Sequence, residues 1–228
     1  MGNNVDRVIF VPVIHTDTES VEAARKTVID TEPDVVAVEL DRTRYHQLSN
    51  PDPVSVESTE IQSGNAIQDL MLQIAKMEKD LGNLTGADVG NEMLAAIEAG
   101  RSIGARIALV DRPIEATAQA LARIPLDEIY RLSGVIPGAV ENLDEGEADD
   151  IISLLKEDGA VDDLMDDFRT EFPTLARVLI DERDEFIARA IKSIMNDVDG
   201  KIVVVLGAGH IDGVTSTLKR MLDHDVAG

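Results

Sequence analysis

Asp34-Val35-Val36-Ala37-Val38-Glu39-Leu40 is an apolar run with a single carboxylate near its end. Continuous runs rich in Val and Ile, unlike alternating ones, are typical of parallel strands that helices cover on both faces. Three more apolar runs are separated from this one by helical stretches, and they lie at Arg7–Ile14, Ala105–Val110 and Lys201–Leu206. The sequence therefore predicts an α/β fold with a central, mostly parallel sheet and helices on both faces.

Helices are expected between the strands from apolar spacing and capping residues. Thr16-Asp17-Thr18-Glu19 resembles a capping box for a helix that stops before Pro33, and Pro113 is expected to open a helix at Ile114. Further helices are expected at Ile61–Leu81, Asn91–Ile103, Leu126–Leu132, Asp149–Glu157, Asp162–Arg169 and Thr174–Val198, with loops at Asn50–Glu60 and Glu141–Glu147. We expect one domain over residues 1–228, with a central helical insertion at roughly residues 50–104 and 114–172.

The composition argues against several functions. With 44 acidic and 21 basic residues, the net charge of -23 repels phosphate backbones and anionic lipids, so we expect no nucleic-acid partner. No segment offers the roughly 20 apolar residues that span a bilayer, and no secretory leader is present, so we expect a cytoplasmic chain without membrane insertion. Without Cys, a metal ion must be held by His, Asp, Glu or water. The acidic bias indicates a halophilic archaeon, with an ordinary acidic protein as the alternative.

Polar side chains follow each of the four predicted strands. His15 follows the first strand, Glu39 lies near the end of the second, the third runs into Asp111-Arg112, and the fourth into Gly207-Ala208-Gly209-His210. The carboxyl ends of parallel strands meet at one edge of a sheet, and ligands bind there in open α/β sheets. We therefore expect these residues to form one site.

The histidines differ in their sequence context. His15 and His210 follow strands that we expect to be neighbours, and neutral imidazoles are common metal ligands, so both are candidate ligands. His46 and His224 are expected to be ordinary surface residues. The glycines before His210 resemble a phosphate-binding loop only weakly, and we expect them to turn the chain sharply so that His210 lies at a helix N-terminus.

Glu39 and the residues after the third strand have structural alternatives. An unpaired ion in an apolar run is too costly, so Glu39 must be paired, protonated or metal-bound. An ion pair with Arg42 or Arg44 is the structural alternative to a role in the site. Similarly, Asp111-Arg112 could be a helix cap followed by a surface cation.

The last long predicted helix carries charges that interrupt its apolar face. Glu182 and Arg183 lie four residues before apolar positions of that face, so we expect both to point into the site or to support it. Asp181 and Asp184 are expected on the outer face. Glu92, at the start of another helix, is a weaker candidate for the site.

Several of these stretches together resemble the motifs of the TraB/PrgY/Tiki family. Val13-Ile14-His15 and the segment Pro33–Arg44, which includes Asp41 and Arg44, are similar to the family's opening signature. Asp111–Ile114 resembles its middle motif, Glu182–Asp184 its helix motif, and Gly207–Gly213 its closing motif. The family places a Gly three residues before each of two His; Gly207 fits this pattern, whereas Pro12 replaces the first Gly.

The resemblance implies a fold similar to erythromycin-esterase and haem-binding ChaN-like proteins. For Tiki relatives it implies metal-dependent peptide cleavage, and for pheromone-shutdown relatives the control of a signal peptide. Archaeal relatives often carry a C-terminal membrane region, which implies a membrane-tethered protein if the native chain has one. A haem-binding role is disfavoured, because two Tyr and few other aromatic residues could line a haem slot.

These observations predict a metal-dependent hydrolase that acts on a peptide, an amide or another small molecule. His15 and His210 would bind Mn, Co or Zn, with Glu39 as third ligand or as base, and Arg112 and Arg183 would stabilise negative charge. The other predicted site residues are Glu182 in the catalytic set and, in supporting positions, Asp41, Arg44, Glu92, Asp111, Gly207 and Gly209. The alternative is a non-enzymatic module that sequesters a peptide or ligand in the same cleft. Homodimer formation is left open.

Overall fold

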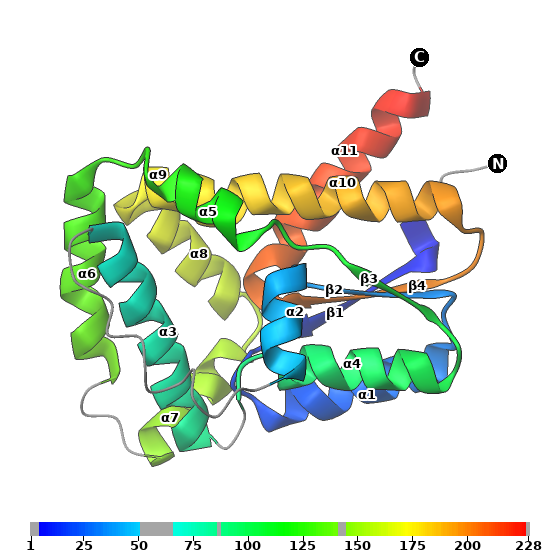
Figure 1. The fold of residues 1–228 in the computed structure, drawn as a ribbon, viewed down its shortest axis with the longest axis horizontal. Helices are drawn as coiled ribbons and strands as arrows, with labels where there is room; N and C mark the ends of the chain where they lie inside the picture. The colour runs from blue at the N-terminus through cyan, green and yellow to red at the C-terminus, as the bar shows by residue number, and fades with distance from the viewer. Residues whose placement is uncertain (1–4, 51–65, 86–87, 141–144, 227–228) are drawn as a thin grey trace.

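The computed structural model describes residues 5–50, 66–85, 88–140 and 145–226, and it contains an all-parallel sheet of four strands (Figure 1). The strands follow the order β1-β4-β2-β3 across the sheet. Their bounds are β1 Val8–Val13, β2 Val35–Val38, β3 Arg106–Leu109 and β4 Ile202–Gly207. The α/β class and the four predicted strands are confirmed, and each strand end differs from its prediction by at most two residues.

The register of the strands brings their carboxyl ends together. Val13, the last residue of β1, pairs with Gly207 of β4, and Val38 of β2 pairs with Val205. All six residues of β4 are buried, as expected for a central strand. Pro12 lies in the edge strand β1, where a proline is tolerated because an edge strand needs fewer backbone donors.

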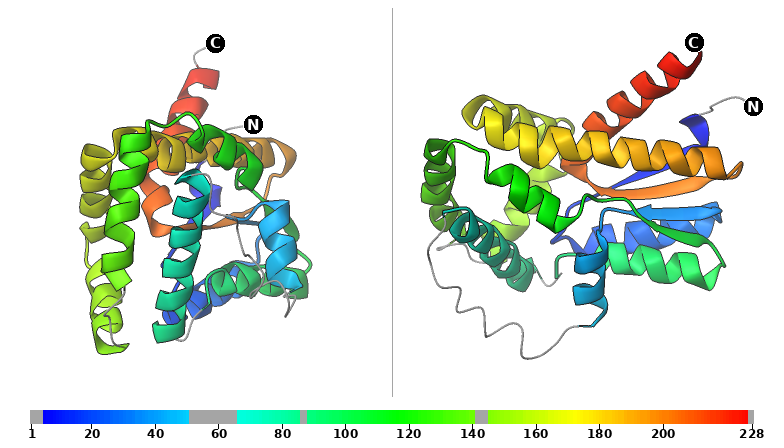
Figure 2. Two further views of the ribbon diagram at one scale, coloured as in Figure 1. Left: turned by 60° about the vertical axis from the view of Figure 1, so that its left-hand side comes forward. Right: turned by 45° about the horizontal axis from the view of Figure 1, so that its top comes forward.

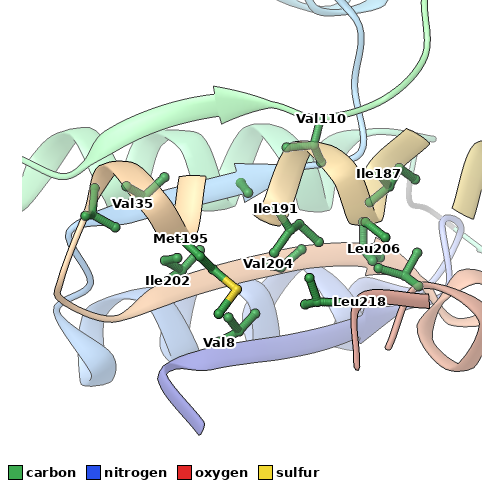
Figure 3. Close-up of a cluster of buried hydrophobic side chains, with 14 of the residues drawn as sticks. Val8, Val35, Val110, Ile187, Ile191, Met195, Ile202, Val204, Leu206 and Leu218 are labelled. Atoms are coloured by element: carbon green, nitrogen blue, oxygen red, sulfur yellow. The ribbon is translucent and has the colours of Figure 1, made fainter. Parts of the chain in front are cut away.

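Helices cover both faces of the sheet, as predicted. α1 (Thr18–Thr31) and α4 (Asn91–Ser102) lie on one face, and α10 (Glu182–Asp197) and α11 (Ile211–Val226) lie on the other (Figure 1). The side chains of alternate β4 residues point to opposite faces of the sheet. Val204 and Leu206 pack under α10 and α11, together with Ile187, Ile191 and Leu218 (Figure 3), whereas Val203 and Val205 pack toward α1 and α4. Each such side chain contributes about 1.5–3 kcal/mol by its burial.

Helices α3 and α5 to α9 form a lobe beyond the carboxyl ends of the strands (Figure 2). Their bounds are α3 Ala66–Thr85, α5 Ile114–Leu121, α6 Leu126–Val140, α7 Glu145–Leu155, α8 Ala160–Glu171 and α9 Pro173–Ala176. The lobe has its own apolar core, in which Leu70, Ile129 and Leu175 are fully buried. The lobe therefore lies beside the edge of the sheet where the polar residues were expected to meet.

Some predicted details were wrong. Asp17, and not Thr16, caps α1, because its carboxylate accepts hydrogen bonds from the backbone N–H groups of Glu19 and Ser20. Helix α2 (Arg42–Ser49) was not predicted, since only one side chain, Asp41, marks its start. By contrast, α5 begins at Ile114, directly after Pro113, as predicted.

The later helices also differ from the prediction. α6 continues to Val140, and α7 begins at Glu145 inside the predicted acidic loop. The predicted helix over residues 174–198 is interrupted by a π-helical turn, η2 (Arg177–Asp181), directly before α10. Most of the predicted loop Asn50–Glu60, the first residues of the predicted helix Ile61–Leu81, and residues 141–144 lie outside the described residues. Among the described helices, none combines the length and the apolar character needed to cross a membrane.

Candidate functional site

Two imidazoles stand at the carboxyl edge of the sheet, and a carboxylate orients each of them. His15 lies in the turn after β1, and its Nδ1 is 2.8 Å from Glu92 Oε1. His210 lies in the 3₁₀ turn η3 (Ala208–His210) after β4, and its Nδ1 is 2.6 Å from Asp184 Oδ1. With the two carboxylates as acceptors, each Nδ1–H donates and each Nε2 is left to face the site. This is the arrangement that commonly orients histidines in metal and catalytic sites.

Glu39 lies next to both imidazoles at the end of β2. Its Oε2 accepts a 2.7 Å hydrogen bond from the backbone N–H of Gly207. Its Oε1 accepts a 2.7 Å hydrogen bond from Arg183 Nη2 and lies 3.5 Å from His210 Nε2. The pairing partner of Glu39 is thus Arg183, and the expected alternative, an ion pair with Arg42 or Arg44, is not what satisfies its two oxygens.

The carboxylate of Glu39 is strongly acidic. Burial alone would raise its pKa, but electrostatic interactions with His210, Arg183 and His15 and the hydrogen bond from the Gly207 N–H outweigh this effect and lower the pKa from 4.5 to about 2. Glu39 is therefore ionised at neutral pH. A carboxylate with such a low pKa is a weak proton acceptor, so its charge matters more than its basicity.

Arg183 links two carboxylates from different strand ends. Its Nε and Nη2 bond to the two oxygens of Asp111, at 3.1 and 2.8 Å, while Nη2 also reaches Glu39. Burial lowers the pKa of the guanidinium, but Glu39 and Asp111 more than compensate and hold the pKa above its usual value. This bidentate contact fixes the orientation of the guanidinium and keeps it charged.

Two glycines allow the close packing of this cluster. A Cβ on Gly207 would lie 3.0 Å from His15 Nε2 and 3.3 Å from Glu39 Oε2, so a side chain there would crowd both groups. A Cβ on Gly213, in the first turn of α11, would lie 1.9 Å from Asp184 Oδ2. Gly213 therefore makes room for the carboxylate that orients His210.

Replacing Gly213 with Ala is expected to destabilise the protein by about 1–3 kcal/mol, because Asp184 must move out of its buried position. Urea unfolding in high salt measures this change. The control is Gly134→Ala in α6, where a Cβ would meet nothing within 4 Å and the helix should gain up to about 1 kcal/mol. Equal effects of the two substitutions would contradict the proposed contact between residue 213 and Asp184.

A cavity of about 370 Å³ opens beside the two imidazoles. Its polar end is formed by His15, His210 and Arg183. The other walls come from β1, from the end of α7, from α8 and from η2, and they carry Val13, Ile14, Leu155, Val161, Leu164, Met165, Phe168, Leu179, Ile180 and Ala208. The site is therefore a polar edge that continues into an apolar space under the helical lobe.

Not all predicted site residues meet at this cavity. Arg112 turns away from it and bonds to Glu182 Oε2, Val178 O and Thr117 Oγ1, at 3.3, 3.0 and 3.2 Å. Glu182 does not point into the cavity; it is partly exposed and pairs with Arg112 and Arg177. These contacts tie the end of β3 to η2, so they support the position of α10.

The predicted supporting residues fall into two groups. Asp41 is buried and caps α2 through the backbone N–H of Arg44, while its second oxygen accepts a 3.0 Å hydrogen bond from Ile114 N. The other group lies at the site itself. Glu92 contacts His15, and Asp111 contacts Arg183. Gly207 contacts Glu39, and Gly209 lies beside Met165. His46 and His224 are exposed, as predicted.

Asp184 is the residue that the sequence analysis placed wrongly. It was expected on the outer face of the helix with Asp181, yet Asp184 is only 3% exposed and bonds to His210. Burial raises its pKa, against the opposing effect of His210. The signal was present in the spacing, since Asp184 precedes the buried Ile187 and Ile191 by three and seven residues, on one stripe of α10.

The side chains fit a divalent metal ion only in part. The two imidazoles, each with its Nδ1 held by a carboxylate, are suitable ligands for Mn, Co or Zn. Both oxygens of Glu39 are already engaged by Arg183 and Gly207, and the described part of the chain holds no group of three His, Cys, Asp or Glu side chains arranged to bind one ion. The fit is thus limited to two imidazoles with a carboxylate beside them.

Comparison with known proteins identifies the family. Residues 3–226 match the model of the TraB/PrgY/gumN family. The chain belongs to this family. It is 28% identical over 223 residues to an uncharacterised protein of Methanocaldococcus jannaschii, a match that covers 96% of the chain and 55% of that protein.

Members of the TraB family in mammals are also similar. The chain is 25% identical to a TraB domain-containing protein of Bos taurus and 23% identical to one of Homo sapiens, each over 235 residues. Each of these matches covers 91% of the chain and 61% of the relative. The chain therefore spans a little over half the length of the relatives that it matches.

Proposed function

We propose that this TraB-family chain is a hydrolase of peptide or amide bonds with its centre at His15, Glu39 and His210. The observation that carries the proposal is the pair of imidazoles whose Nδ1 atoms are held by Glu92 and Asp184. Buried carboxylates that fix the orientation of two histidines beside a cavity are typical of catalytic and metal sites and are unusual in a purely structural core.

A divalent ion held by His15 and His210, with water or substrate as further ligands, would supply a polarised carbonyl and an activated water. Within the chain, Glu39 acts through its negative charge, because its low pKa makes it a weak base. Its Oε1 lies 3.5 Å from His210 Nε2, so this negative charge would stabilise the positive charge of an ion held at the two imidazoles. Arg183, which lines the cavity and stays charged, would face the developing negative charge of the substrate.

A second function is favoured by the bonding of Glu39. Since Arg183 and Gly207 satisfy both of its oxygens and no three-residue metal set is present among the described residues, the same cleft also suits a module that binds a peptide without cleaving it. The two functions differ in turnover, and not in the location of the site.

Replacing His210 with Ala is expected to reduce peptide hydrolysis at least about 100-fold and to lower the bound Mn, Co or Zn. The measurement combines elemental analysis of protein purified in high salt with cleavage of a mixed peptide library. His46→Ala, at an exposed histidine far from this cluster in sequence, is the matched control and should leave both values unchanged. A wild-type protein that retains peptides but cleaves none would favour the binding module, and a fully active His210→Ala variant would refute the proposed centre.

A further inference from the structure

The cavity beside the imidazoles has one polar end and otherwise apolar walls. One end holds His15, His210 and Arg183, and the walls farther from the sheet are apolar side chains of α8 and η2. Leu164 of α8 lines the cavity although it is 50% exposed. An exposed leucine contributes little to folding, but at the mouth of a cavity it offers apolar surface to a bound molecule.

The apolar walls of the cavity offer no charged partner to a ligand side chain. Among the described residues that line it, Arg183 is the only one of the Lys, Arg, Asp and Glu type. Its guanidinium already bonds to Glu39 and Asp111. A charged side chain that entered the apolar part would therefore be desolvated without a partner, which is costly, whereas an apolar side chain would gain by burial.

The contact between α8 and the loop after β4 makes the walls adaptable. A Cβ on Gly209 would lie 3.0 Å from Met165 Sδ, so the absence of a side chain at residue 209 lets Met165 approach the loop beside His210. Methionine is unbranched and flexible, and it fits irregular apolar surfaces well. The wall nearest to His210 can thus adjust to side chains of different shape.

We propose that this cavity is a specificity subsite that accepts one large, uncharged apolar side chain of a peptide, such as Leu, Met or Phe, next to the bond held at His15 and His210. Its volume of about 370 Å³ lies within the range of about 300–1,000 Å³ that is usual for ligand pockets. The inference rests on the proposed function for the nature of the substrate. It goes further in naming the kind of residue that the substrate must present.

The test measures binding separately from turnover. Blocked tripeptides of sequence Ala-X-Ala, with X as Leu, Met, Asp or Lys, are titrated into the wild-type protein in high salt with a chelator present, and affinities are measured by calorimetry. We expect the Leu and Met peptides to bind at least about 10-fold more tightly than the Asp and Lys peptides. Equal affinities for the four peptides would overturn the subsite.

Two variants at similarly exposed leucines, 50% and 56%, locate the effect. Leu164→Asp places a charge at the cavity mouth and should weaken binding of the Leu peptide about 10-fold. Leu154→Asp, in α7, changes a residue that is 56% exposed and does not line the cavity, so it should leave affinity unchanged. A similar loss in both variants, with unchanged thermal midpoints, would contradict the assignment.

A third variant tests the shape of the subsite without adding charge. Val161 lines the cavity, so Val161→Phe narrows it and should shift the preference from the Leu peptide toward an added Ala-Ala-Ala peptide. An unchanged preference would count against the subsite. Failure of the subsite and failure of the proposed function remain distinguishable. If peptides with an apolar side chain bind more tightly but none is cleaved, the subsite is supported and the hydrolase is contradicted. If peptides are cleaved without any side-chain preference, the hydrolase is supported and the subsite is contradicted.

Discussion

Replacing Glu39 with Gln is expected to destabilise the protein by about 3 kcal/mol at neutral pH. The carboxylate is buried and accepts from both Arg183 and the Gly207 N–H, whereas an amide offers only one accepting atom and sets its NH₂ group against a donor. The lowered pKa gives a similar magnitude, since a change from 4.5 to about 2 corresponds to about 3 kcal/mol of stability. Chemical unfolding of the two proteins in high salt measures the difference.

The stability that Glu39 contributes is expected to fall as the pH is lowered. The pKa of Glu39 is lower in the folded state than in the unfolded chain, so its contribution is fully present above about pH 4.5 and is lost as the pH falls toward 2. The stability difference between wild type and Glu39→Gln should shrink over that window. Glu98→Gln is the control, because Glu98 is an exposed side chain in a surface pair with Arg25, and it should change stability by less than about 0.5 kcal/mol. A difference that stays constant down to pH 2 would contradict the assigned ionisation of Glu39.

This prediction also affects how catalysis should be tested. Because Glu39 both holds the site together and stands at its centre, a loss of activity in Glu39→Gln cannot separate the two roles. His210 is the better probe, since its imidazole is only 12% exposed yet its Nε2 faces the site, and Asp184 remains behind it as a hydrogen-bond acceptor. Variants of His210 therefore test turnover more directly than variants of Glu39.

The sheet was predictable because each strand corresponds to one continuous apolar run in the sequence. Four continuous apolar runs, separated by helical segments, leave few alternatives to a parallel sheet with two covered faces. The site followed from the same logic, since the residues after parallel strands must share an edge. The order of strands and polar residues along the chain is thus enough to predict one site with His15, Glu39, Asp111 and His210, and the lobe is not needed for it.

The parts that the sequence analysis missed depend on contacts between distant segments. The face of Asp184 was misassigned because one continuous helix over residues 174–198 was assumed, whereas a π-helical turn precedes α10 and the buried stripe of Asp184, Ile187 and Ile191 lies within α10 alone. Arg112 was expected in the site because of its position after β3, but its direction depends on Val178 O and Glu182, about 70 residues away. The apolar wall of the cavity comes from α8, whose apolar residues gave no sign from their spacing of which surface they face.

The melting temperature is expected to rise steeply with salt, by about 10 °C or more between dilute buffer and 2 M KCl, which corresponds to about 3–5 kcal/mol. The net charge of -23 produces self-repulsion that favours expanded states, and molar salt reduces the Debye length to about 3 Å. The exposed carboxylates of the lobe add to this locally, since α8 alone carries four exposed aspartates, Asp162, Asp163, Asp166 and Asp167. Thermal scans followed by circular dichroism measure the effect.

Two controls separate charge screening from a general effect of cosolutes. Sucrose strengthens apolar burial without screening charge, so it should raise the midpoint much less than KCl at the same water activity. A variant with Asn at Asp149, Asp150, Asp163 and Asp167, all exposed, removes four negative charges and should be more stable in dilute buffer and less sensitive to KCl. If instead the midpoint is independent of KCl, the acidic surface is not an adaptation to salt. In that case the stability of the lobe over the cavity depends on its apolar core around Leu70, Ile129 and Leu175 rather than on the ionic medium.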